Sequence, residues 1–150
     1  MDSEHSAAPD VSDDTVKALG TLSEALEKVE RARGHLYAFH QLSGAADIAL
    51  GEAVDQLRRA GHATVADGLD RVLVGRNVLP GRWTFQIVEE YDDDYWSVFR
   101  ALEADARQQL VGGRRHLLEA GMKRAEVTPG EPGHELTPAD LGESAITDRG

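Results

Sequence analysis

The chain has 150 residues, enough for one domain with tails, and 41% hydrophobic residues, enough for a modest core. It contains no cysteine. That excludes disulfides and thiolate metal sites and suits a reducing compartment, so we expect a cytoplasmic protein. The formal net charge is −11; residues 1–15 and 126–150 carry −5 each, which leaves −1 for residues 16–125. A nearly neutral body with acidic tails argues against general nucleic-acid binding, which needs a basic surface, so we expect none.

Both acidic ends are predicted to be disordered tails, at residues 1–12 and 126–150. The first lacks the basic start and apolar run of a secretory signal, and the second has three prolines, four glycines and few large apolar residues. The second tail is interpreted as a solubilising segment or as a peptide that docks another protein, and the first interpretation is preferred. Residues 13–125 are predicted to form the helical bundle domain. The sequence contains no apolar stretch of about 18 residues, so we predict no membrane span.

The first predicted helix covers about residues 13–60 and carries a seven-residue repeat. Its two seams alternate three and four residues apart, as the core positions of a coiled coil do. They consist of Leu19, Leu26, Arg33, His40, Asp47 and Val54, and of Leu22, Val29, Leu36, Ser43, Leu50 and Leu57. The two seams predict that this helix packs lengthwise against another helix.

The centre of this helix is predicted to be buried on all sides. From residue 34 to residue 51 only Asp47 carries a full formal charge, and apolar side chains point in nearly all directions. A helix that is apolar all round is a buried helix. Because the rest of the chain offers too few helices to cover it, we expect self-association with residues 34–51 near the interface.

Two further helices are predicted, at about residues 63–74 and 84–122, separated by a Pro-Gly turn. The apolar stripe of the longer one, interrupted by Asp92, consists of Val88, Tyr95, Phe99, Leu102, Ala106, Leu110, Gly113 and Leu117. No alternating strand pattern competes with these helices. The predicted fold class is therefore all-α, a long helical hairpin or bundle completed by oligomerisation.

The polar centre of the first seam is the main candidate site. Arg33, His40 and Asp47 point toward the predicted core, and each needs a partner because an unpaired buried polar group costs ~1–3 kcal/mol. Asp92 interrupts the stripe of the third helix and is a candidate partner for Arg33 or His40. The preferred interpretation is a lock on helix register. The alternative is a ligand site between the first and third helices, formed by Arg33, His40, Asp47, Asp92 and Tyr95.

A metal site is the second interpretation of the same region. No cofactor is predicted by default, but His40, Asp47, Glu89 and Asp92 are residue types that bind a divalent metal ion. The acidic run around Glu89 otherwise suits the N-terminal end of a helix, where the dipole favours anions. Binding of metal therefore depends on an alignment of the helices that the sequence does not reveal.

Enzymatic patterns are weaker. Glu27, Glu30, Glu52 and Asp55 have the order of the acidic pattern in all-α nucleotide pyrophosphohydrolases, but one helix would hold Glu30 and Glu52 roughly 33 Å apart, so we interpret the match as coincidence. No phosphate loop or nucleophilic cysteine is present. The leading hypothesis is a non-enzymatic, oligomeric helical-bundle interaction or scaffold protein that binds itself. The alternative is a metal- or small-ligand-binding bundle.

Overall fold

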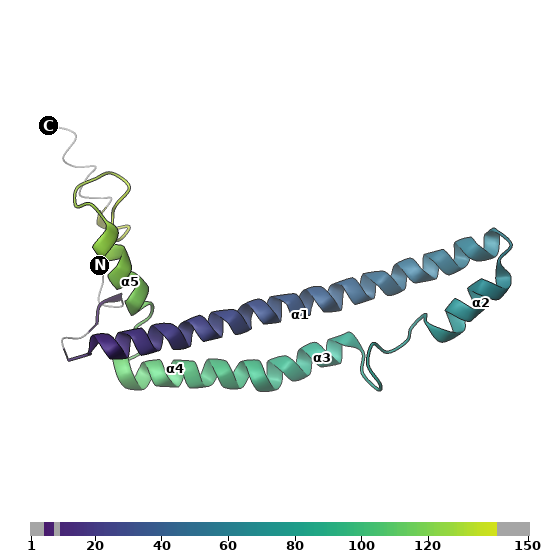
Figure 1. The fold of residues 1–150 in the computed structure, drawn as a ribbon, viewed down its shortest axis with the longest axis horizontal. Coiled ribbons are helices and arrows are strands. Elements are labelled where there is room, and N and C mark those ends of the chain that lie inside the picture. The colour runs from purple at the N-terminus through teal and green to yellow at the C-terminus, as the bar shows by residue number, and fades with distance from the viewer. Residues whose placement is uncertain (1–4, 8–9, 141–150) are drawn as a thin grey trace. The chain divides into compact units, whose positions relative to one another are not determined.

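The computed structural model describes residues 5–7 and 10–140, and the regular elements within these ranges are all helices (Figure 1). They belong to two compact units, one formed by Lys28–Val98 and the other by Met1–Glu27 with Phe99–Gly150. Helices α1 (Asp13–Arg59) and α4 (Ser97–Val111) contribute residues to both units. The all-α fold class predicted from the sequence is confirmed. The predicted tails fall partly outside the described residues, at 1–4, 8–9 and 141–150.

Helix α1 begins and ends where its local chemistry favours termini. The Ser12 hydroxyl accepts a hydrogen bond from the backbone N–H of Thr15 at 3.2 Å, which satisfies one of the free amides of the first turn. Two aspartates occupy the first turn and two arginines the last, in agreement with the helix dipole. Gly61 follows the helix with a φ of +89°, a left-handed conformation that glycine adopts without strain. The predicted bounds of about 13–60 are confirmed.

Helix α2 (Ala63–Val72) follows α1 after a short turn and ends two residues before its predicted boundary. Within residues 28–98 the buried positions come from α1, α2 and α3 (Thr84–Tyr91), and they are Val29, Val54, Ala66, Thr84 and Val88. This core is small and one-sided. On the central part of α1, Leu42 and Ile48 are 70% and 69% exposed, so one chain alone does not bury this stretch on all sides.

The prediction of one helix over residues 84–122 is wrong. The segment divides into α3, a π-helical turn η2 (Asp92–Trp96), α4 and α5 (Leu117–Glu126). Helix α4 ends because Gly112 and Gly113 adopt φ values of +61° and +79°, which no right-handed helix contains. The two consecutive glycines are the sequence signal for this break.

The π-helical turn also corrects the predicted apolar stripe. A π-helical turn holds more residues than an α-helical turn, so positions beyond it rotate relative to a regular 3.6-residue pattern. Leu102 and Leu110, predicted to be inward, are 64% and 54% exposed. Their neighbours Glu103 and Val111 are buried instead, each only 6% exposed. The buried face has therefore moved by one residue after η2.

In the unit that contains both termini, α5 packs against the beginning of α1. Gly20 provides the space, because a Cβ atom at this position would lie 2.4 Å from Cδ2 of Leu118. The buried Glu103 accepts a hydrogen bond from the Ser23 hydroxyl at 3.1 Å and forms an ion pair with Arg107 at 3.0 Å. A carboxylate is thus buried here together with the donors that satisfy it.

We expect two glycine-to-alanine substitutions in α1 to differ. Nothing lies within 4 Å of a Cβ atom at position 44, so Gly44→Ala should raise the free energy of unfolding by about 0.5–1 kcal/mol through helix propensity. Gly20→Ala should not raise the free energy of unfolding, because its Cβ atom must displace Leu118. Urea unfolding followed by circular dichroism measures both. Equal stabilisation by the two changes would contradict the packing of α5 on α1.

Candidate functional site

A row of polar contacts joins α1 to the returning chain within residues 28–98. Three polar residues of α1 spaced seven residues apart each bond a partner on the returning chain, and those partners are spaced eight and nine residues apart. The pairs, which together we call the polar seam, are Arg33 with Asp92, His40 with Thr84, and Asp47 with Gly75. Because the partners follow one another in reverse order along the chain, the three contacts describe one antiparallel alignment of the hairpin.

Arg33 and Asp92 form the most extensive contact of the polar seam. Arg33 Nε and Nη2 donate to the two carboxylate oxygens of Asp92, at 2.7 and 3.1 Å, in a two-bond geometry. The Tyr37 hydroxyl donates to Asp92 Oδ2 at 3.2 Å. The Arg33 guanidinium carbon lies 4.0 Å from the ring centroid of Trp96 and 5.0 Å from that of Tyr37. The cation is therefore held by a carboxylate and two aromatic rings at once.

The ion pair of Arg33 and Asp92 is partly shielded from solvent. The side chains of Arg33 and Asp92 are 27% and 19% exposed. The hydrogen bonds and positive charge of Arg33, together with the bond from Tyr37, lower the pKa of Asp92 below its ordinary value of 3.8, against the opposite effect of burial. The same hydrogen bonds raise the pKa of Arg33. Both groups are therefore charged at neutral pH.

The π-helical turn η2 brings two of these groups to α1. Asp92 is its first residue and Trp96 its last. The indole N–H of Trp96 donates to Glu30 Oε1 at 3.0 Å, while Asp92 contacts Arg33. The Ser97 hydroxyl donates to the backbone carbonyl of Asp92 and so binds an acceptor within the turn. The irregular turn thus coincides with the two residues that contact Arg33 from the returning chain.

The other two contacts of the polar seam are single hydrogen bonds. His40 Nδ1 and the hydroxyl of the buried Thr84 lie 2.7 Å apart, and the His40 ring meets the ring of Phe85 edge-on at 5.4 Å. Asp47 Oδ1 accepts the backbone N–H of Gly75 at 2.8 Å. Gly75 has a φ of +70° and lies in the turn that follows α2. Its bond to Asp47 therefore attaches this turn to α1.

The structure brings together part of the predicted ligand set. Arg33 and Asp92 meet directly, one of the two pairings considered from the sequence. His40 and Asp47 contact separate partners. Tyr95 is 55% exposed, and the centroid of its ring lies 5.7 Å from that of Tyr91. Among the described residues no buried polar side-chain atom lacks a hydrogen-bond partner.

The four residues of the metal interpretation are distributed along the hairpin. Asp92 bonds Arg33, His40 bonds Thr84, Asp47 bonds a backbone amide, and Glu89 is exposed. Within residues 5–7 and 10–140, no group of three or more His, Asp or Glu side chains has a geometry suited to a metal ion. The metal site stays a prediction.

Sequence reasoning missed the aromatic partners of the polar seam. Tyr37 follows Arg33 by four residues, and Trp96 follows Asp92 by four residues, so helical spacing placed each beside its charged neighbour. The contact of Thr84 with His40 had no such signal, because it depends on how the loop between α2 and α3 returns to α1.

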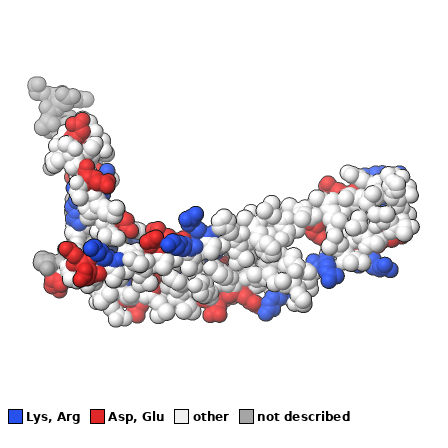
Figure 2. Space-filling view, viewed as in Figure 1, with Lys and Arg blue, Asp and Glu red and all other residues white. Residues whose placement is uncertain are grey.

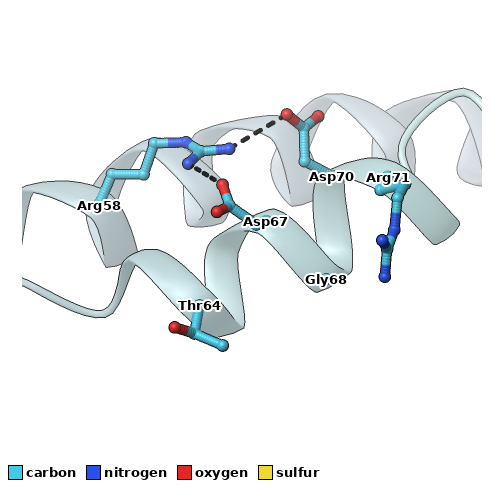
Figure 3. Close-up of a pocket in the computed structure, with 6 residues that line it drawn as sticks. All are labelled: Arg58, Thr64, Asp67, Gly68, Asp70 and Arg71. Carbon is cyan, nitrogen blue, oxygen red and sulfur yellow. Dashed lines mark hydrogen bonds and ion pairs between the residues drawn. The ribbon is translucent and has the colours of Figure 1, made fainter.

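A second candidate region lies where α2 meets the end of α1 (Figure 3). A surface hollow of about 590 Å³ is lined by Arg58, Thr64, Asp67, Gly68, Asp70 and Arg71. Arg58 points at Asp67 and Asp70 and pairs with both, while Arg71 projects away from them. The two ion pairs of Arg58 therefore link the end of α1 to α2 at an exposed surface.

No family model matches the chain, and searches of curated proteins and of solved structures found no match. Among the described residues, none of the helices has an apolar run long enough to cross a membrane.

We expect Arg33→Gln to lower the free energy of unfolding by about 1–3 kcal/mol, because it leaves a partly buried carboxylate without its cation. Arg82→Gln is the matched control. Arg82 pairs with Glu90 at 3.3 Å, but its side chain is 46% exposed and that of Glu90 61%, so its loss should have almost no effect. Chemical denaturation measures both variants. Equal losses would contradict a larger contribution of the Arg33–Asp92 pair than of the exposed Arg82–Glu90 pair.

The stability of the wild-type chain relative to Asp92→Asn should depend on pH. Because folding lowers the pKa of Asp92, the charged carboxylate contributes stability that is fully present above its ordinary pKa of 3.8. This contribution is lost as the pH falls through the lowered pKa of the folded state. Urea unfolding of both proteins at pH 7 and at a series of values below 4 measures the difference. A difference independent of pH would contradict the ion pair.

Proposed function

We propose that this chain is a non-enzymatic helical interaction or scaffold protein that self-associates through the centre of α1. The observation that carries the proposal is the exposure of large apolar side chains there. Leu42 is 70% exposed, Ile48 69% and Phe39 43%. Burial of one such side chain contributes about 1.5–3 kcal/mol, so a partner helix against this stretch gains free energy.

The polar seam supports this proposal by accounting for the opposite side of α1. Arg33 and Asp47 are the only formally charged residues between positions 32 and 51, and both bond the returning chain. The charges therefore hold the hairpin together, while the far side of the same helix is left without any. A register lock inside the chain and an interaction surface outside it are compatible roles for one helix.

The proposed first partner is a second copy of the chain, and the proposed compartment is the cytoplasm. The absence of cysteine suits a reducing environment. Docking of another protein by the C-terminal segment stays a prediction, because residues 141–150 lie outside the described ranges.

A charge on the exposed side of α1 should abolish self-association. We expect the wild-type chain to be a dimer or larger at micromolar concentration, and Leu42→Glu to be a monomer, because a desolvated carboxylate opposes helix packing. Leu102→Glu is the matched control, since Leu102 in α4 is 64% exposed and lies far from this stretch along the chain. Gel filtration with light scattering measures the masses. A monomeric wild-type protein would rule out the proposed function.

A further inference from the structure

The exposed side of α1 carries a heptad pattern of its own. Eight exposed residues alternate four and three positions apart, and we call them the outer seam: Arg31, His35, Ala38, Leu42, Ala45, Ala49, Glu52 and Gln56. This is the spacing of positions that face a partner helix in a coiled coil. Together with the polar seam, α1 thus has two packing faces, one used within the chain and one exposed.

The outer seam has opposite charges at its two ends and none between them. Arg31 lies at its N-terminal end and Glu52 near its C-terminal end, and both are exposed. Positions 35 to 49 of the seam carry no formal charge with histidine neutral. In the view of Figure 2, the centre of α1 is correspondingly a white stretch without red or blue atoms.

Resting on the proposed self-association, we propose that two copies pair antiparallel through the outer seam, with the two-fold axis between Leu42 and Ala45. In this arrangement Leu42 of one copy lies opposite Ala45 of the other, and Ala38 opposite Ala49. Each large side chain then faces a small one, twice per dimer, as a symmetric interface requires. His35 faces Glu52 of the second copy.

A parallel pair would match these residues less well. Equivalent positions would face each other, so Leu42 would meet Leu42 while Ala38, Ala45 and Ala49 would each meet another alanine. Arg31 would lie opposite Arg31, and Glu52 opposite Glu52, which places like charges at both ends of the contact. The antiparallel arrangement instead brings the basic end of one helix to the acidic end of the other.

The absence of cysteine in the chain permits a direct test by disulfide cross-linking. In the antiparallel pair, positions 38 and 49 of the two copies are neighbours, whereas position 38 lies 11 residues, or about 16 Å, from its own equivalent. Disulfides require Cα atoms within about 7 Å. We therefore expect Ala38→Cys and Ala49→Cys to cross-link on oxidation when mixed, and neither to cross-link alone.

A control and three outcomes separate the possibilities. Ala101→Cys, exposed on α4, mixed with Ala38→Cys reports random collisions and should give no cross-link. Cross-linking of each single variant with itself would establish a parallel pair and overturn the orientation alone. A dimer without any cross-link would overturn the outer seam as the interface, with self-association still standing. A wild-type monomer in light scattering would overturn the proposed function as well.

Discussion

The contact between Arg33 and Asp92 is the constraint on which the hairpin of residues 28–98 depends. A long helix with a repeating apolar face tolerates slippage against its partner, because neighbouring heptads are similar. A partly buried ion pair with two hydrogen bonds favours one alignment, since a shift of the two segments breaks both bonds. The contacts of His40 and Asp47 further along α1 are consistent with that same alignment.

The sequence predicted the helices better than their faces. The bounds of α1 and α2 followed from periodicity, terminal charges and glycine, which are local properties. The single helix over 84–122 was wrong because η2 and the Gly112–Gly113 break interrupt a pattern that regular spacing treats as continuous. The one-residue shift after η2 explains why Glu103 rather than Leu102 is buried.

For the candidate site, the sequence predicted the participating residues better than their partners. Arg33, His40 and Asp47 were predicted to face inward from the seven-residue spacing alone, and Asp92 was singled out by its intrusion into an apolar stripe. The structure leaves Asp47 exposed, with its carboxylate bonded to the Gly75 amide. Their partners depend on tertiary alignment. The sequence allowed Asp92 to meet either Arg33 or His40, and the backbone amide of Gly75 has no side-chain signature.

The one-sided core connects the two faces of α1. The returning chain covers only part of the circumference of α1. Polar residues of α1 lie along the centre of the covered side. The apolar residues of the same stretch therefore lie elsewhere on the helix, where Leu42 and Ile48 remain exposed. Hydrophobic burial drives helix packing more strongly than satisfied ion pairs do. This division of α1 supports the proposal that polar contacts align its hairpin and that its exposed apolar residues pack against a second copy.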